Sequence, residues 1–184
     1  MKFFEQKIPG VWLIQPEVYD DNRGGFYRAF CMEAFARQGL AFQIQQTNYS
    51  INKKRLTLRG IHYRKESLPE VKVLTCVRGR IFNVITDMRK SSPTFGAWMA
   101  FELSQQNGLA LYLPHGCGNG FLTLEDDTAV HYYHSSIYQN GADTGVRYND
   151  SFFEITWPEM PAVISDKDIS YPDFAPELSN IQTT

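Results

Sequence analysis

The chain has 184 residues, of which 21% are charged, and a formal net charge of -2. This length fits one domain that buries roughly 70% of its unfolded surface. Lys and Arg are scattered except at residues 53–55, so no basic surface for nucleic acid is predicted. The first residues mix charged and apolar side chains, and no stretch is long enough to span a membrane. We therefore expect a cytoplasmic protein without membrane contact.

The three cysteines are Cys31, Cys76 and Cys117. Their number is odd, and their spacing matches neither a CxxC pair nor a Cys/His zinc site. We interpret them as structural thiols.

Short apolar runs separated by turn residues predict an all-β chain. The first strand is expected at residues 11–14, followed by a short helix at residues 31–38 that Gly39 ends. The later runs cover residues 58–63, 71–77, 80–88, 97–103, 109–113 and 129–133. The 13 Phe and 10 Tyr suit half-buried strands.

Turn residues connect the predicted strands. Arg78-Gly79 predicts a tight hairpin, and residues 105–108 supply a turn that ends in Asn-Gly. Prolines make the C-terminal third rich in loops, at Pro158, Pro161 and Pro172. Residues 178–184 are expected to fray. The whole pattern predicts one antiparallel double-sheet jelly roll with short helices over residues 1–184.

The run at residues 58–63 places Arg59, Gly60 and His62 among apolar neighbours. Regular strand alternation puts His62 on the face opposite to Arg59, so the two are not expected to share a face. A histidine in such surroundings is more often a hydrogen-bonded core residue than a catalyst, and the residues alone leave both open.

Three further residues admit a plain structural interpretation and a chemical one. Lys72 shares a face with Leu74, which places the ammonium either on an exposed strand face or in a cavity. Tyr132 shares a face with His134, where a tyrosine usually packs its ring. Asp168 fits a surface turn. Taken together with a histidine, however, these residue types can remove and return a proton at a carbon beside a ketone, as an epimerisation requires.

Ordered motifs over residues 10–174 carry a family resemblance. They are DNRGGF at 21–26, QTNYS at 46–50, LRGIHY at 58–63, SPTFG at 92–96, LPHGCGNGF at 113–121, Tyr132 with Tyr138, ND at 149–150, ITWP at 155–158 and SDKD at 165–168. On these motifs the sequence resembles the dTDP-4-dehydrorhamnose 3,5-epimerases. These are cupin-like jelly-roll enzymes of deoxysugar biosynthesis, including that of lipopolysaccharide O-antigen.

The resemblance implies a catalytic set and a binding set. It implies that His62, oriented by Asp168, is the general base, that Tyr132 is the acid on the other face of the sugar ring, and that Lys72 stabilises the enolate at the C4 oxygen. The substrate-binding positions that it implies are Arg23, Phe26, Arg28, Gln46, Asn48, Arg59, Asn119, Tyr138, Asp143 and Lys167. The planar fork of Arg59 suits a diphosphate.

The resemblance also bears on cofactors and partners. It implies no metal and no organic cofactor, and the sequence lacks the HxH pair with a downstream carboxylate that a metal-binding jelly roll needs. The expected partner is a nucleotide-diphosphate 4-keto-6-deoxysugar. A homodimer that exchanges contacts through its N-terminal strands is also expected.

Two positions depart from the family pattern. Asn119 stands where the family usually has a histidine, and an amide cannot titrate. Arg28 stands where the family usually has a glutamate, so an acceptor has become a donor. Both changes point to a shifted substrate, with the nucleotide base and the number of inverted carbons left open.

Several functions therefore stay open beside a 3,5-epimerase. One is a C5-only epimerase of a CDP-3,6-dideoxy-4-hexulose, and another is a non-catalytic module that binds sugar nucleotides. A 3,4-ketoisomerase and a metal-dependent jelly-roll oxygenase or isomerase are further possibilities on the same fold. The missing ligand pair disfavours the metal-dependent enzymes.

Overall fold

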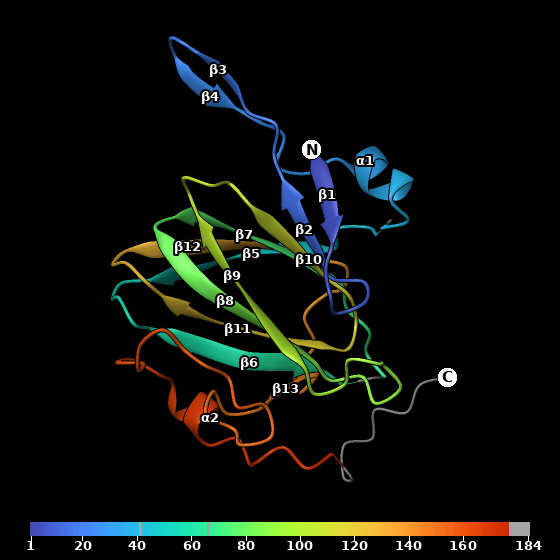
Figure 1. The fold of residues 1–184 in the computed structure, drawn as a ribbon, viewed down its shortest axis with the longest axis vertical. Coiled ribbons are helices and arrows are strands. Elements are labelled where there is room, and N and C mark those ends of the chain that lie inside the picture. Colours follow the sequence, from blue (N-terminus) through green and yellow to red (C-terminus); the bar gives the residue numbers. More distant parts are fainter. Residues whose placement is uncertain (41, 66, 177–184) are drawn as a thin grey trace.

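Two antiparallel sheets packed face to face form the body of the protein, as the computed structural model shows (Figure 1). The structure describes residues 1–40, 42–65 and 67–176. The expected fraying of residues 178–184 lies outside this part of the chain. The predicted all-β jelly roll is confirmed, because the described residues are mostly strands in antiparallel sheets.

One sheet has six strands and the other has five. The six-stranded sheet has the order β1 (Lys2–Glu5), β2 (Trp12–Gln15), β10 (Ala110–Leu113), β7 (Lys72–Arg78), β12 (Thr128–His134) and β5 (Gln46–Asn52). The five-stranded sheet has the order β13 (Asp143–Gly145), β6 (Leu58–Arg64), β11 (Cys117–Thr123), β8 (Arg80–Asp87) and β9 (Trp98–Ser104). Each predicted run overlaps one of these strands to within one residue at its ends, whereas β1, β5, β11 and β13 were not predicted as strands.

The hairpin predicted at Arg78-Gly79 is wrong. Strand β7 lies in the six-stranded sheet and β8 in the five-stranded sheet, so the chain crosses between the layers at this point. Gly79 has a φ of +72°, which suits a tight turn, but turn residues do not tell whether the two strands pair. The turn at residues 105–108 is confirmed, and it too connects the two sheets.

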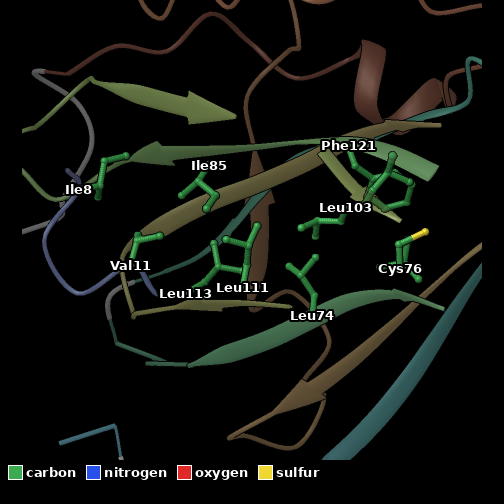
Figure 2. Close-up of a cluster of buried hydrophobic side chains, with 11 residues drawn as sticks. Ile8, Val11, Leu74, Cys76, Ile85, Leu103, Leu111, Leu113 and Phe121 are labelled. Atoms are coloured by element: carbon green, nitrogen blue, oxygen red, sulfur yellow. The ribbon is translucent and has the colours of Figure 1, made fainter. Parts of the chain in front are cut away.

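Apolar side chains from both sheets meet between the layers (Figure 2). Leu74 and Leu111 from the six-stranded sheet pack with Ile85, Leu103 and Phe121 from the five-stranded sheet, and each is at most 1% exposed. Burial of one such side chain stabilises the fold by roughly 1.5–3 kcal/mol. The sandwich is therefore held together across its full thickness, and Phe121 extends from this core to the cavity described below.

The predicted short helix is confirmed as α1 (Met32–Arg37), followed by Gly39 at a φ of +73°. Its Phe35 packs on a second apolar cluster that includes Ile14, Val73 and Tyr112 of the six-stranded sheet. Helix α1 therefore lies against this sheet.

The C-terminal third is rich in loops, as predicted, and it covers the five-stranded sheet. Phe153 and Val146 pack with Ile61 and Val84 in a third apolar cluster. The short helix α2 (Asp166–Ile169) begins at Ser165, whose hydroxyl accepts a hydrogen bond from the Asp168 amide at 3.1 Å. This cap places Asp168 beside β6.

A two-stranded arm, β3 (Tyr19–Asp21) and β4 (Gly24–Phe26), projects away from the sandwich (Figure 1). Tyr19 is 71% exposed and Phe26 is 74% exposed. The arm therefore makes little contact with the body of its own chain.

The described residues hold no disulfide. Cys31, Cys76 and Cys117 are free thiols. Within the described ranges, no group of three or more His, Cys, Asp or Glu side chains is arranged to hold a metal ion. Among the helices of these ranges, none has the length and apolar character needed to cross a membrane.

Candidate active site

Strand β6 departs from regular alternation at the most polar part of the site. Asn119 of β11 pairs with His62, and Phe121 pairs with Arg59. Between these two pairs the chain advances by two residues on β11 but by three on β6, so β6 carries one extra residue. Such a β-bulge turns side chains of one strand to the same side. Arg59 and His62 accordingly line one cavity, and the prediction that they face opposite ways is wrong.

Gly60 makes this bulge possible. It has a φ of +100°, and a Cβ at this position would lie 2.6 Å from the Asn119 carbonyl oxygen and 2.7 Å from the Gly120 Cα. Both the backbone conformation and the close approach of β11 therefore require glycine here.

A cavity of about 240 Å³ opens between the two sheets. The five-stranded sheet contributes Arg59, His62, Asn119, Gly120 and Phe121, and the six-stranded sheet contributes Asn48, Tyr49, Ser50, Lys72, Tyr132 and His134. A second cavity of about 390 Å³ shares Arg59 and His62 and is also lined by Ser165, Lys167 and Asp168. The two cavities thus meet at the predicted base.

His62 and Asp168 form a hydrogen-bonded pair, with 2.7 Å between Nε2 and Oδ1. The other oxygen of Asp168 accepts the Gly60 amide at 3.0 Å. Burial opposes ionisation of Asp168, but the hydrogen bonds from His62 and Gly60 outweigh it and hold the pKa of the carboxyl below its usual range. Because an ionised carboxylate only accepts, the proton lies on Nε2 of His62 and leaves Nδ1 as the basic nitrogen.

Lys72 and Tyr132 enter the same cavity from the six-stranded sheet. The sequence left open whether Lys72 lies on an exposed strand face or in a cavity, and the structure places it in the cavity. The Lys72 ammonium lies 3.1 Å from the Glu70 carboxylate. Burial raises the pKa of the Tyr132 hydroxyl, and the nearby positive charge of Arg59 only partly offsets this. Tyr132 therefore keeps its proton at neutral pH and can donate it.

Arg59 and Asn48 are brought to the cavity, as expected for binding residues. The Nε of Arg59 donates to Asn52 at 2.7 Å, which leaves the terminal nitrogens of the fork for an anion. No carboxylate among the described residues forms an ion pair with Arg59. Gln46 is on β5 with Asn48, and its Oε1 accepts the Tyr138 amide at 2.6 Å.

Asn119 lines the cavity, but its amide hydrogens are already used. Its Nδ2 donates to Asn83 Oδ1 at 3.0 Å and to the Val84 carbonyl oxygen at 3.1 Å. Donation to a substrate would break these buried bonds, so Asn119 offers the cavity no readily available proton.

Six predicted binding residues line neither cavity, and Gln46 and Tyr138 are two of them. Arg23 and Phe26 sit on the projecting arm, and Arg28 is exposed with its guanidinium 3.7 Å from the Cys31 sulfur. Asp143 instead pairs with Arg64 at 3.5 Å. Within one chain, the structure does not place these six residues in the lining of the cavities that hold the catalytic set.

Two residues near Lys72 were missed from the sequence. His134 lines the cavity, and Glu70 lies buried between His134 and Lys72. Alternation with Tyr132 placed His134 on the correct face, so a signal for it existed. The position of Glu70 just before β7 gave no comparable signal.

The cavity thus holds a base oriented by a carboxylate on one sheet, and a cation and a protonated phenol on the facing sheet. These groups suit the transfer of a proton at a carbon beside a carbonyl, with charge developing on the carbonyl oxygen.

Comparisons with known proteins agree with this chemistry. The family model described as dTDP-4-dehydrorhamnose 3,5-epimerase matches residues 5–176. A relative of that name from Sinorhizobium fredii is 37% identical over 173 residues, which cover 94% of this chain and 89% of the relative.

Two solved structures have the same fold. The dTDP-4-dehydrorhamnose 3,5-epimerase of Bacillus anthracis, with TDP and PPi bound, is similar with a TM-score of 0.91 at 33% identity, over 94% of this chain and 99% of that chain. A 3'-monoepimerase from Streptomyces bikiniensis, in complex with dTDP-quinovose, has a TM-score of 0.85 at 34% identity, over 91% and 85% of the two chains.

Proposed function

Since the chain belongs to the dTDP-4-dehydrorhamnose 3,5-epimerase family, we propose that its cavity inverts the sugar through His62, Lys72 and Tyr132. The protein is an isomerase of deoxysugar biosynthesis that acts on a nucleotide-linked 4-keto-6-deoxyhexose at C3, C5 or both. The observation that carries the proposed roles is the position of His62 opposite Tyr132, on the two facing sheets of one cavity.

His62 removes the proton from the carbon beside the ketone. Asp168 holds the ring through Nε2 and stabilises the imidazolium that forms. The ring is therefore kept in the one tautomer in which Nδ1 is the base. A positioned base of this kind contributes typically 10²–10⁴-fold to the rate.

Lys72 stabilises the enolate oxygen at C4. A proton beside a ketone is only weakly acidic, so the developing negative charge needs a cation that is already in place. The Lys72 side chain is 19% exposed and fixed by an ion pair, which limits its reorganisation during the reaction.

Tyr132 returns a proton to the opposite face of the ring, and this step completes the inversion. The raised pKa of its hydroxyl keeps the proton on the oxygen until the carbanionic carbon accepts it. Solvent then restores the proton of Tyr132 and removes that of His62.

The nucleotide is proposed to be dTDP, since the relatives of known structure bind TDP or dTDP-quinovose. Arg59 is the proposed diphosphate ligand because its fork is free of carboxylates and lies at the junction of both cavities. Asn48 and Lys167 line these cavities and are proposed to bind the rest of the substrate.

A C5-only epimerase remains the second candidate, with a CDP-3,6-dideoxy-4-hexulose as substrate. Asn119 favours it, because this cavity residue has no free amide hydrogen for a 3-hydroxyl group. Arg28 lends less support, since it is exposed and outside the cavity of its own chain.

We further propose a homodimer in which the arm reaches the cavity of the second copy. The arm carries Arg23 and Phe26, both expected at the substrate, yet it projects away from its own sandwich. The Arg23 side chain is 85% exposed.

A cytoplasmic location stays a prediction, with which three free thiols agree.

Mixing inactive variants tests the shared site. Arg23→Ala and His62→Ala homodimers should each have low activity, whereas co-refolded mixtures should regain up to about one quarter of wild-type activity, since half of the molecules are heterodimers with one intact site. Light scattering should show a dimer. A monomer, or a mixture without recovery, would reject the shared site.

The experiment that tests the function is deuterium uptake from heavy water into dTDP-4-keto-6-deoxyglucose, followed by mass spectrometry and NMR. Exchange at C3 and C5 would establish action at both centres, and exchange at one carbon would establish a single-centre enzyme. If nothing exchanges, the CDP-linked ketosugar is tested next. Binding of both compounds without any exchange would reject catalysis and leave the non-catalytic binding module.

A further inference from the structure

A buried carboxylate lies behind the cavity, outside the proposed catalytic set. One Glu70 oxygen is 3.1 Å from the Lys72 ammonium, and the other is 3.2 Å from Nδ1 of His134. The same oxygen accepts the Ser136 hydroxyl at 2.8 Å and lies 3.6 Å from the Arg64 guanidinium. The Glu70 side chain is only 4% exposed, so these contacts take the place of water.

Glu70 is ionised in this setting. Burial opposes its charge, but the contacts with His134, Lys72 and Ser136 outweigh burial and lower its pKa to about 2. A carboxylate without a proton can only accept hydrogen bonds.

His134 is fixed on both sides. Its ring stacks on Tyr132 with centroids 5.8 Å apart, and its Nε2 lies 3.3 Å from the Asn48 side-chain nitrogen. Nδ1 of His134 faces the Glu70 carboxylate at ion-pair distance without forming a hydrogen bond at this geometry. The negative charge favours a proton on that nitrogen, and Nε2 then accepts from the Asn48 amide. The Asn48 amide is thereby held in one orientation.

We propose that Glu70 and His134 form a second histidine–carboxylate pair, opposite His62 and Asp168, that positions Lys72 and Asn48 for the ketosugar. Glu70 acts on Lys72 directly and on Asn48 through His134. This inference rests on the proposed function of the cavity.

The two histidine–carboxylate pairs differ in whether the histidine keeps a ring nitrogen free for a substrate. Asp168 takes Nε2 of His62, and no hydrogen bond to Nδ1 from the described residues competes with a substrate. In His134, Nδ1 faces the Glu70 carboxylate at 3.2 Å, and Nε2 is paired with the Asn48 amide. His134 therefore has no free basic nitrogen, so it positions its neighbours and does not act as a second base.

A double-mutant cycle tests the action of Glu70 through Lys72. Glu70→Gln should lower kcat for deuterium exchange about 10- to 100-fold, the cost of a small displacement of a reacting group. Its Kd for dTDP should stay within about twofold of wild type. In a Lys72→Met background the same change should cost several-fold less, because only the action of Glu70 on Asn48 through His134 is then left to lose.

Glu102→Gln is the matched control, since Glu102 is an exposed carboxylate that also pairs with a cation, Arg80, at 3.4 Å. It should leave kcat unchanged. An unchanged kcat in Glu70→Gln would overturn the proposal, as would an equal loss with and without Lys72. A wild-type protein that exchanges no deuterium would instead be a failure of the proposed function.

NMR of the wild-type protein tests the His134 part without any variant and without activity. Imidazole ¹⁵N shifts should show His134 with its proton on Nδ1 and His62 with its proton on Nε2. A His134 ring with its only proton on Nε2 would overturn the proposed pair, even if Glu70→Gln fails to fold.

Discussion

The two walls of the cavity are built in different ways. On the six-stranded sheet, His134 pairs with Lys72 and Tyr132 pairs with Leu74 in regular register, and the register shift of these two strands lies away from them, between Ala129 and Val130. On the five-stranded sheet, a bulge at Gly60 turns Arg59 and His62 to the same side. The regular wall holds Lys72 and the proposed acid, and the irregular wall holds the proposed base and the proposed anion-binding guanidinium.

This difference separates two ways of placing functional groups. The regular wall depends on strand alternation and on one buried carboxylate, Glu70, behind it. The irregular wall depends on one glycine and on Asp168, which a loop and a short helix bring to β6. The regular wall should therefore be most sensitive to loss of the charge on Glu70. The irregular wall should be most sensitive to substitutions that change the backbone conformation, as at Gly60.

Removal of the base from the irregular wall should have the largest effect. His62→Ala should lower deuterium exchange at least about 10³-fold, the usual contribution of a general base. Because the His62 side chain is 35% exposed, the thermal denaturation midpoint should change little. Exchange at the wild-type rate would contradict the assignment of the base.

Acid should weaken the regular wall through Glu70. Its pKa is lowered from 4.5 to about 2, so its stabilisation is present above about pH 4.5 and is lost as the pH falls toward 2. The shift corresponds to about 3 kcal/mol of unfolding free energy.

Urea denaturation of wild type and Glu70→Gln from pH 7 to pH 2 measures this contribution. The difference in unfolding free energy between the two proteins should shrink by about 3 kcal/mol as the pH falls. A difference that stays constant with pH would contradict the buried ion pairs of Glu70.

A methyl group at the bulge should have a smaller effect on the unfolding free energy. Gly60→Ala should destabilise the fold by about 2 kcal/mol, since its Cβ meets the backbone of β11 and its φ is positive. Gly141→Ala is the matched control, with a φ of +77° and no atom within 4 Å of the added Cβ. It should cost about 1 kcal/mol. Equal losses would show that β11 does not restrict Gly60.

Alternation along the regular wall made that wall predictable. The sequence placed Tyr132 and His134 on one face and Lys72 on the face of Leu74, and the structure agrees. The type of reaction was predicted from the ordered motifs of the family. Strand alternation alone does not indicate which reaction these residues catalyse. Glu70 was missed because it precedes β7, where no strand period applies.

The irregular features were not predictable from local patterns. The bulge that unites Arg59 and His62 depends on the partner strand β11, which is distant in sequence and was not predicted as a strand. The false hairpin at Gly79 has the same origin, since a turn does not reveal which sheet receives the next strand. Pairing partners, unlike strand positions, are set by contacts across the whole chain.

The central claim is that the base and the acid act from opposite walls, and Tyr132→Phe tests it most directly. This variant keeps the ring and removes the hydroxyl that returns the proton. In heavy water, with deuterium uptake and epimer formation measured in one sample, it should still exchange the proton beside the ketone, because His62 is intact, while inversion falls about 10²-fold or more. Inversion at the wild-type rate would contradict the claim.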